Sequence, residues 1–173
     1  MGTDKAELRA PGSELLLWQK QLQTLEQLQP ARIFWSGPAR SGIPDYICRV
    51  DDVFQDSGPL GGISTCLDLL ETDLLVVLAI DMPCMTAAFL QKLLARSSRD
   101  VGCVGYHGDF FEPLAAVYPK AMAVLARDQL LSGRYAMQTF VRAGFAAGHF
   151  VSVTLGPETI PFFQNWNAPG DLS

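Results

Sequence analysis

Apolar and polar positions along this chain alternate between two periods, one typical of helices and one typical of strands. Between residues 15 and 28 the apolar residues recur at spacings of three and four, with Gln and Lys between them. This predicts a helix that Ser13 caps and Pro30 ends. Its apolar face comprises Leu15, Trp18, Leu22, Leu25 and Leu28.

The rest of the chain continues the alternation. We predict strands at 31–35, 46–50, 74–80, 100–106 and 149–155, and a loop from residue 110 that leads into one more strand ending near 119. Helices are predicted after residue 62 and at 86–96, 122–131 and 135–143, followed by a turn-rich end at 161–172. Alternating strands and helices predict a mainly parallel sheet between helical layers, in one α/β domain over residues 1–173.

The order of these elements is unusual at its start. Nothing before residue 31 has the pattern of a strand, whereas a doubly wound sheet usually begins with a central strand and a phosphate-binding loop. Two alternatives follow. Either the fold begins in an uncommon way, or a first strand and its loop are absent from this sequence.

The most apolar strand pattern, at 74–80, ends at a single carboxylate, Asp81. Its length and β-branched content are typical of a strand covered on both faces, and Pro83 prevents further ladder pairing. Ligands of open α/β sheets bind at the carboxyl ends of the strands, so Asp81 is well placed to hold a metal ion. The alternative is a structural role as a helix cap or turn former.

A glycine-rich turn precedes the helix that leads to this strand. Gly58, Gly61 and Gly62 follow Asp51 and Asp52 at the end of the strand at 46–50. The turn matches neither G-x-G-x-x-G nor the Walker A pattern. Its glycines serve either tight packing of the helix or the approach of an anion to backbone amides at the helix start.

Composition and charge narrow the range of functions. The 173 residues are 49% hydrophobic and 18% charged, as in folded globular proteins, and the net charge of −5 argues against a nucleic-acid partner. The chain has no apolar signal segment and no run that spans a bilayer, so we expect a cytoplasmic protein. The cysteines lack a C-x-x-C pair, which predicts buried free thiols: Cys48, Cys66, Cys84 and Cys103.

Several short motifs resemble one family, the nucleotidyltransferases of the molybdenum cofactor and specifically molybdenum cofactor guanylyltransferase. The first residues, Met-Gly-Thr-Asp-Lys-Ala, are similar to the tail of the family's N-terminal signature. The resemblance continues through Val-Asp-Asp at 50–52, the glycine turn at 58–63, Asp-Met-Pro at 81–83 and Glu-Pro-Leu at 112–114. It ends at the segment 163–172, and it implies a three-layer Rossmann-like nucleotidyltransferase fold.

The resemblance also implies roles for single residues. Lys5 would contact the phosphates of GTP, Asp52 would lie in the nucleotide pocket, and Asp81 would bind Mg²⁺. Asn165 and Asn167 would stand near the cleft for the molybdopterin-type cofactor. The implied reaction is attack by the molybdopterin phosphate on the α-phosphorus of GTP, and the implied protein partners are molybdoenzymes or other cofactor-biosynthesis proteins.

One departure from the family pattern is large, because the Leu-Ala-Gly-Gly loop and the first central strand are missing. Two neighbouring strands would then carry unpaired amides and carbonyls, each costing about 1–3 kcal/mol when buried. We therefore expect poor stability or inactivity unless a partner or rearrangement fills the gap, and an apolar strand encoded upstream of Met1. Three alternatives stay open: an active guanylyltransferase, a remnant that only binds ligand or partner, and a cytidylyl- or sugar-phosphate nucleotidyltransferase.

Overall fold

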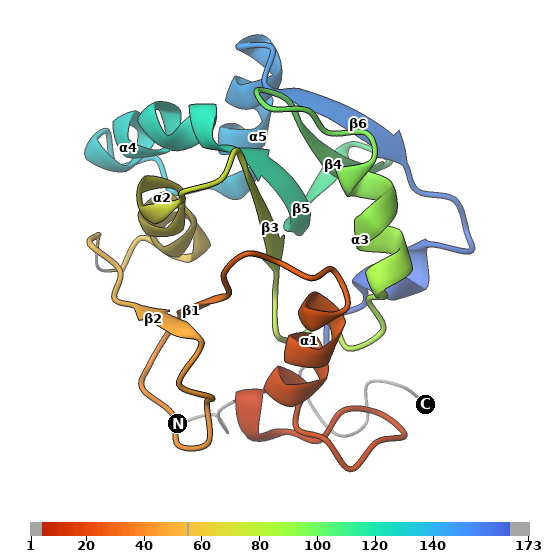
Figure 1. Ribbon diagram of the computed structural model, residues 1–173. Coiled ribbons are helices and arrows are strands. Elements are labelled where there is room, and N and C mark those ends of the chain that lie inside the picture. Colours follow the sequence, from red (N-terminus) through yellow and green to blue (C-terminus); the bar gives the residue numbers. More distant parts are fainter. Residues whose placement is uncertain (1–4, 55, 167–173) are drawn as a thin grey trace.

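The computed structural model describes residues 5–54 and 56–166 (Figure 1). Its helices are α1 (Leu17–Glu26), α2 (Pro59–Leu69), α3 (Ala87–Leu94), α4 (Ala123–Leu131) and α5 (Met137–Ala146). Its strands are β1 (Phe34–Ser36), β2 (Cys48–Val50), β3 (Leu74–Leu78), β4 (Gly102–His107), β5 (Phe110–Pro119) and β6 (Phe150–Thr154). Short 3-10 turns are η1 (Lys5–Glu7), η2 (Lys120–Met122) and η3 (Ile160–Phe163).

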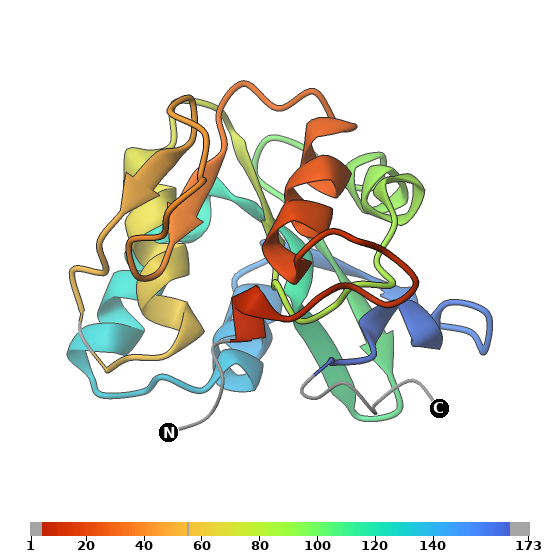
Figure 2. The ribbon, with the colours of Figure 1, turned by 90° about the horizontal axis from the view of Figure 1, so that it is seen from below.

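The strands of the described residues form two sheets rather than one. β1 and β2 pair in parallel, and the larger sheet has the order β3-β5-β4-β6. In the larger sheet β3, β4 and β6 run in one direction and β5 runs in the other. The predicted α/β class is confirmed, and strand directions are mainly parallel. Figures 1 and 2 show the β1–β2 pair set apart from the larger sheet.

Helices cover both faces of the strands and give the predicted three layers. On one face α2, α4 and α5 enclose a core with Val104, Ala116 and Tyr118 of the sheet. On the other face α3 packs on Cys103, Ala115 and Val117, with Leu25 of α1 at the margin of this core. Side chains alternate between these cores along each strand, as the pleat requires.

Several element boundaries differ from the prediction; strand β1, for example, spans Phe34–Ser36 rather than 31–35. Helix α1 begins at Leu17 rather than after Ser13, because the Ser13 hydroxyl accepts the N–H of Leu15 in a turn while the Gln19 side chain accepts the N–H of Leu16. Helix α2 begins at Pro59, so Gly61 lies inside it rather than in a preceding turn. Strand β5 begins at residue 110, where a loop was predicted.

The structure also bears on the predicted thiols and on the possibility of a membrane-spanning helix. All four cysteines are free thiols, as predicted, although Cys48 and Cys84 are only half-buried. In the part of the chain that the structure describes, no helix is long and apolar enough to cross a membrane.

Candidate functional site

A cavity of about 680 Å³ lies between the two sheets. Strands β1 and β3 line it from opposite sides, and helices α1 and α2 contribute side chains from above and below. The strand residues that line it belong to the segments 33–36 and 74–79, which are largely apolar. Asp81, Ser36 and Arg40 add polar groups to the lining.

The open cavity explains why β3 is less buried than predicted. Of its five residues only Leu75 is buried, and the other four are partly exposed. The prediction of a strand covered on both faces was therefore wrong in degree. Helices do cover the faces, but one edge of the strand opens into the cavity.

Asp81 follows β3 at its carboxyl end, as the sequence predicted. Its side chain is 18% exposed, and its Oδ2 atom lies 3.2 Å from the Nζ atom of Lys5. Its backbone C=O accepts the N–H of Trp166 at 2.7 Å, so the turn holding the carboxylate is fixed from a distant segment. The structure thus brings together two of the three residues that were predicted for the site.

The turn η1 shows that the carboxyl ends of β1 and β3 meet at the same end of the cavity. Lys5 pairs with Asp81, which follows β3, while Glu7 pairs with Arg40, which follows β1. Because η1 spans only three residues, both strands must end close to it. Asp81 and Arg40 therefore lie at the end where α/β sheets bind ligands. Further polar residues line the cavity next to the amino ends of β1 and β3, namely Arg32, Glu71 and Thr72.

Asp52 lies on the other side of this end, beyond β2. Its Oδ1 atom accepts a hydrogen bond from the Ser36 hydroxyl at 3.0 Å. A Cβ atom added to Gly62 would meet the Ser36 Oγ atom at 2.1 Å and the Asp52 Oδ1 atom at 3.2 Å. Gly62 and Ser36 line the cavity, so Asp52 supports its wall through Ser36.

The glycine turn mixes the two roles that the sequence left open. Gly61 is required for packing, because an added Cβ would meet the Ser57 Oγ atom at 2.2 Å. Gly62 permits the close approach of Ser36 and Asp52 to helix α2. Both glycines therefore serve packing, and only Gly62 also lines the cavity.

Several residues of the cavity were not singled out from the sequence. The Nε2 group of Gln21, from α1, donates to the C=O of Ala79 at 3.0 Å and of Met82 at 2.6 Å. Trp18 and Trp35 meet edge to face with ring centroids 6.3 Å apart, and the Arg40 guanidinium lies over Trp35 at 5.9 Å. A glutamine between the apolar positions of an amphipathic helix is usually exposed, and tryptophans are usual core residues, so sequence pattern alone does not reveal these roles.

Cys66 is the thiol that lines the cavity from α2. Burial raises its pKa to about 12, with the nearby Asp52 charge acting in the same direction. The thiol is therefore protonated at neutral pH and is a poor nucleophile.

The single carboxylate of Asp81 fits one kind of metal ion. Among the described residues no group of three or more His, Cys, Asp or Glu side chains is placed to hold a metal. Mg²⁺ commonly takes only one or two carboxylates and completes its shell with phosphate oxygens and water. A single partly exposed carboxylate therefore fits Mg²⁺ that arrives with a phosphate ligand, and it does not fit a closed structural site.

Asn165 is exposed and directly precedes Trp166, which binds the backbone of Asp81. It therefore lies beside the candidate site. Asn167 lies outside the described residues.

Comparison with known proteins adds an independent line of support. The family model that matches residues 1–147 is described as "MobA-like NTP transferase domain". A protein of Opitutus terrae named "Probable molybdenum cofactor guanylyltransferase" is 34% identical over 176 residues, covering 99% of this chain and 86% of the relative. These matches confirm the family resemblance seen in the sequence.

Solved structures agree on the fold. The molybdopterin-guanine dinucleotide biosynthesis protein A of Archaeoglobus fulgidus superposes with a TM-score of 0.73 at 22% identity, covering 99% of this chain and 88% of that one. The 2-C-methyl-D-erythritol 4-phosphate cytidylyltransferase of Thermus thermophilus gives a TM-score of 0.71 at 14% identity, covering 97% and 90%. Both superpose over nearly the whole chain, so the likeness shows the fold.

Proposed function

Because the chain belongs to the MobA-like NTP transferase family, we propose that it transfers GMP from GTP to Mo-molybdopterin, forming the guanine dinucleotide cofactor. The relative from Opitutus terrae carries the matching name. The observation that carries the proposal is the Lys5–Asp81 pair, which stands at the carboxyl end of β3 and beside the cavity. One cation and one carboxylate at this edge suit a polyphosphate with its metal ion.

The reaction joins two phosphate groups. An oxygen of the acceptor's phosphate forms a bond to the α-phosphorus of GTP, and the bond from that phosphorus to the bridging oxygen breaks, so pyrophosphate leaves. No proton needs to be removed from an ionised phosphate, and no covalent enzyme intermediate is required. The protein's task is to position two polyanions and to neutralise developing charge.

Lys5 and Asp81 divide this task. The Lys5 ammonium group is 45% exposed and reaches Asp81, so it can turn to phosphate oxygens while it stays at the same edge. The Asp81 carboxylate would hold Mg²⁺, which when bound neutralises phosphate charge as a Lewis acid. The Asp81 turn is held in place through its backbone, by Trp166, and the carboxylate stays accessible.

Asp52 is proposed to contribute to recognition of the base. A carboxylate offers two acceptor oxygens, and guanine presents N–H donors to such a group. One oxygen of Asp52 already accepts the Ser36 hydroxyl, which fixes the orientation of the carboxylate. Asn165, exposed beside the Asp81 turn, is proposed to stand near the cleft for the molybdopterin-type cofactor.

A nucleotide-binding measurement tests this assignment. GTP, CTP and UTP are titrated into one preparation in the presence of Mg²⁺, and we expect GTP to bind most tightly. Lys5→Ala should weaken GTP binding, because a phosphate contact is lost. Arg9→Ala removes another exposed cation of the same segment, one that pairs with Glu14 outside the cavity, and should leave GTP binding unchanged. Equal binding of GTP and CTP would remove the guanine assignment.

A further inference from the structure

Glu112 is a half-buried carboxyl group at the carboxyl edge of the larger sheet. Strand β5 is antiparallel to β3, so its first residues lie beside the last residues of β3. The N–H of Ala79 donates to the C=O of Leu114 at 2.8 Å. Two residues beyond this hydrogen bond, toward the same end of the sheet, are Asp81 after β3 and Glu112 in β5. Both carboxyl groups therefore extend from the end where α/β sheets bind ligands.

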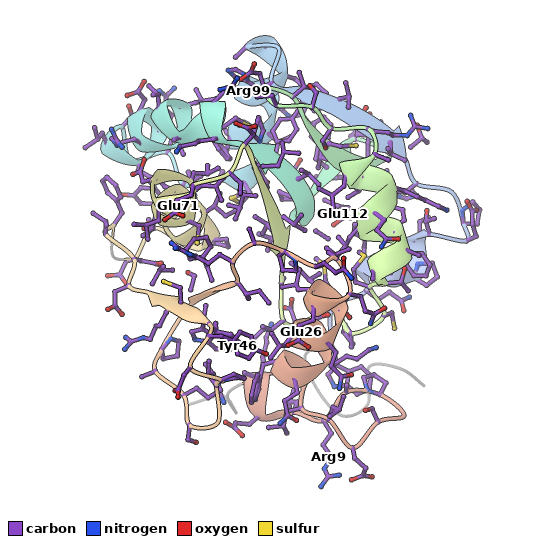
Figure 3. All side chains as sticks on the ribbon, in the orientation of Figure 1. Arg9, Glu26, Tyr46, Glu71, Arg99 and Glu112 are labelled. Carbon is purple, nitrogen blue, oxygen red and sulfur yellow. The ribbon has the colours of Figure 1, made fainter. Side chains whose placement is uncertain are left out.

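The order of the strands puts Asp81 between Asp52 and Glu112. Asp52 follows β2, in the small sheet across the cavity from β3, whereas Glu112 belongs to β5 on the other side of β3. Figure 1 shows this order of strands, and Figure 3 shows Glu112 on the side of β3 away from the small sheet. The product of the proposed reaction carries guanine and pterin at opposite ends of a pyrophosphate. With the phosphates at Asp81 and guanine at Asp52, the pterin would lie toward Glu112.

Cross-strand contacts show which face of the sheet carries the Glu112 side chain. Glu112 lies opposite Gly105 of β4, and the side chains of opposite residues share a face. A Cβ atom added to Gly105 would meet Leu155 at 3.1 Å and Phe163 at 3.2 Å, so the segment after β6 covers this face. The same segment goes on to bind the backbone of Asp81. Glu112 and Asp81 thus border one segment from two strands.

An accessible aromatic ring lies next to Glu112 on this face. Phe110 stands two residues before Glu112 in the same strand, so both side chains leave the same face. Phe110 is 66% exposed, and His107, opposite it in β4, is exposed as well. The face is covered at Gly105 and open at Phe110, with Glu112 at the border. A planar ring stacked on Phe110 would direct its edge toward the Glu112 carboxyl group.

The backbone around Glu112 is held from both sides. The Oε1 atom of Gln138, from α5, accepts the N–H of Phe111 at 3.1 Å, and its Nε2 group donates to the C=O of Phe111 at 2.7 Å. On the other side, Pro113 restricts Glu112 to extended backbone. The position of the carboxyl group is therefore set before a ligand binds, as recognition requires.

Within residues 5–54 and 56–166, no side chain forms a hydrogen bond or an ion pair with the Glu112 carboxyl group. Burial raises the pKa of this group, and the nearby His107 acts in the opposite direction. A half-buried carboxylate without donors is costly to ionise. Two N–H groups from a ligand would offset that cost.

We propose that Glu112 binds the 2-amino-4-oxopyrimidine edge of the acceptor's pterin, with the ring stacked on Phe110, and so selects the acceptor. This inference rests on the function proposed above. The edge carries two adjacent N–H donors, on N3 and on the 2-amino group, which match the two oxygens of one carboxylate. The guanine of GTP carries the same pair of donors, and the experiment separates the two ligands.

Two small probes test the assignment on the full chain. They are 6-hydroxymethylpterin phosphate and the corresponding lumazine, in which an oxygen replaces the 2-amino group. Calorimetric titration with Mg²⁺ present should show the pterin binding at least about tenfold more tightly, because the lumazine oxygen would face a carboxylate oxygen. Glu112→Gln offers one acceptor and one donor, which suit the lumazine edge. The variant should therefore lose or reverse the preference.

Controls separate recognition of the edge from stacking and from folding. Phe110→Ala should weaken binding of both probes by a similar factor, because stacking does not depend on the 2-substituent. Val124→Ala changes a residue of α4 that is 64% exposed and should alter neither affinity. Glu158→Gln changes an exposed acid of the segment after β6 and should keep the preference for pterin. The affinity for GTP should be the same in Glu112→Gln and in the unmodified chain.

Three results would overturn the proposal: equal binding of the two probes by the unmodified chain, an unchanged preference in Glu112→Gln, and a loss of GTP affinity in Glu112→Gln. The last would assign the carboxylate to guanine. If Glu112→Gln fails to fold, the two probes on the unmodified chain and on Phe110→Ala still decide the matter. A chain that prefers the pterin probe but transfers nothing from GTP would remove the proposed reaction and leave pterin recognition in place.

Discussion

The Nζ atom of Lys5 lies 3.2 Å from the Oδ2 atom of Asp81, although 76 positions separate them in the chain. The pair joins the turn η1 to the end of strand β3 and so places a cation and a carboxylate at one end of the cavity. Ion pairs with an exposed partner contribute little to stability, so we expect loss of this pair alone to change the stability of the fold little. The predictions below follow from that placement.

Replacing Asp81 with Asn should abolish nucleotidyl transfer with little effect on the fold. The substitution removes the charge that would hold Mg²⁺, while the Trp166 hydrogen bond to the Asp81 backbone is kept. We expect a loss of about 100-fold or more in transfer rate, the scale of single electrostatic contacts to a transition state. Pyrophosphate release and the unfolding temperature measure the two effects. Asp51→Asn alters an exposed acid that pairs with Arg49 and serves as the control. Activity within a few-fold of the unmodified chain would refute the role of Asp81.

Replacing Asp52 with Ala should weaken GTP binding and relax discrimination against CTP. The carboxylate is exposed, and it accepts the Ser36 hydroxyl at 3.0 Å. Ser36→Ala removes that hydrogen bond but keeps the carboxylate, so it should have the smaller effect on GTP affinity. Calorimetric titration of both nucleotides into the three proteins gives the comparison. If Asp52→Ala leaves the GTP-to-CTP ratio of affinities unchanged, Asp52 does not read the base.

Replacing Gly62 with Ala should destabilise the chain by about 1–3 kcal/mol, as overpacking typically does. The new Cβ would meet the Ser36 Oγ atom at 2.1 Å, which outweighs the preference of a helix for alanine. Denaturant unfolding measures the change in free energy. The double variant Ser36→Ala, Gly62→Ala should recover part of the loss, because the nearest atom is gone while the Ser36 Cβ stays at 3.1 Å. An equal loss in the double variant would contradict this account of the glycine.

Glu112 should make stability depend on pH. Burial raises the pKa of its carboxyl group, against the lowering effect of His107, so the folded chain holds this proton more tightly than the unfolded chain. The resulting stabilisation is complete below the unfolded pKa and is lost as pH rises through the folded pKa. Figure 3 shows Glu112 on the sheet, far from the exposed Arg9.

The test compares Glu112→Gln with the unmodified chain from about pH 4 to about pH 7. The variant does not titrate at this position, so its unfolding temperature relative to the unmodified chain should increase as the pH rises. Glu71→Gln, at a side chain that is 76% exposed, should show no such trend. A constant difference for Glu112→Gln would show that burial does not control this carboxyl group.

Much of the fold was predictable because apolar residues recur along the chain at the spacing of a helix or of a strand. The strand at 74–80 and the helix at 86–96 were found within a few residues, and Thr86 does cap α3 through its hydroxyl. The antiparallel strand β5 was only partly foreseen. It pairs with β4 across a short turn in which Gly108 has a φ of +58°, and alternation of strands and helices alone does not reveal such a hairpin.

The sequence predicted one mainly parallel sheet with its first strand missing, and the division into two sheets was not predicted. No strand-like segment precedes β1, and the structure keeps β1 and β3 apart with a cavity between them. What the sequence did not reveal is how the two parts stay joined. Tyr46, before β2, donates its hydroxyl hydrogen bond to Glu26 of α1, and Figure 3 shows the two side chains next to each other.

The candidate site was predictable where single residues follow strands and not where contacts come from distant segments. Lys5, Asp52 and Asp81 were named from motifs, and the structure pairs Lys5 with Asp81. The support that Ser36 gives to Asp52 depends on β1 lying beside α2, a relation between segments that no local pattern records. The Gln21 contacts to the β3 end are long-range for the same reason.

The most direct test of the proposed function is a transfer assay with three nucleotides. The chain is incubated with Mg²⁺, a molybdopterin acceptor and GTP, CTP or UTP labelled at the α-phosphate. We predict that label from GTP enters a dinucleotide product as pyrophosphate is released, and that label from CTP and UTP does not. Transfer from CTP or UTP in place of GTP, or no transfer from GTP, would contradict the proposed function.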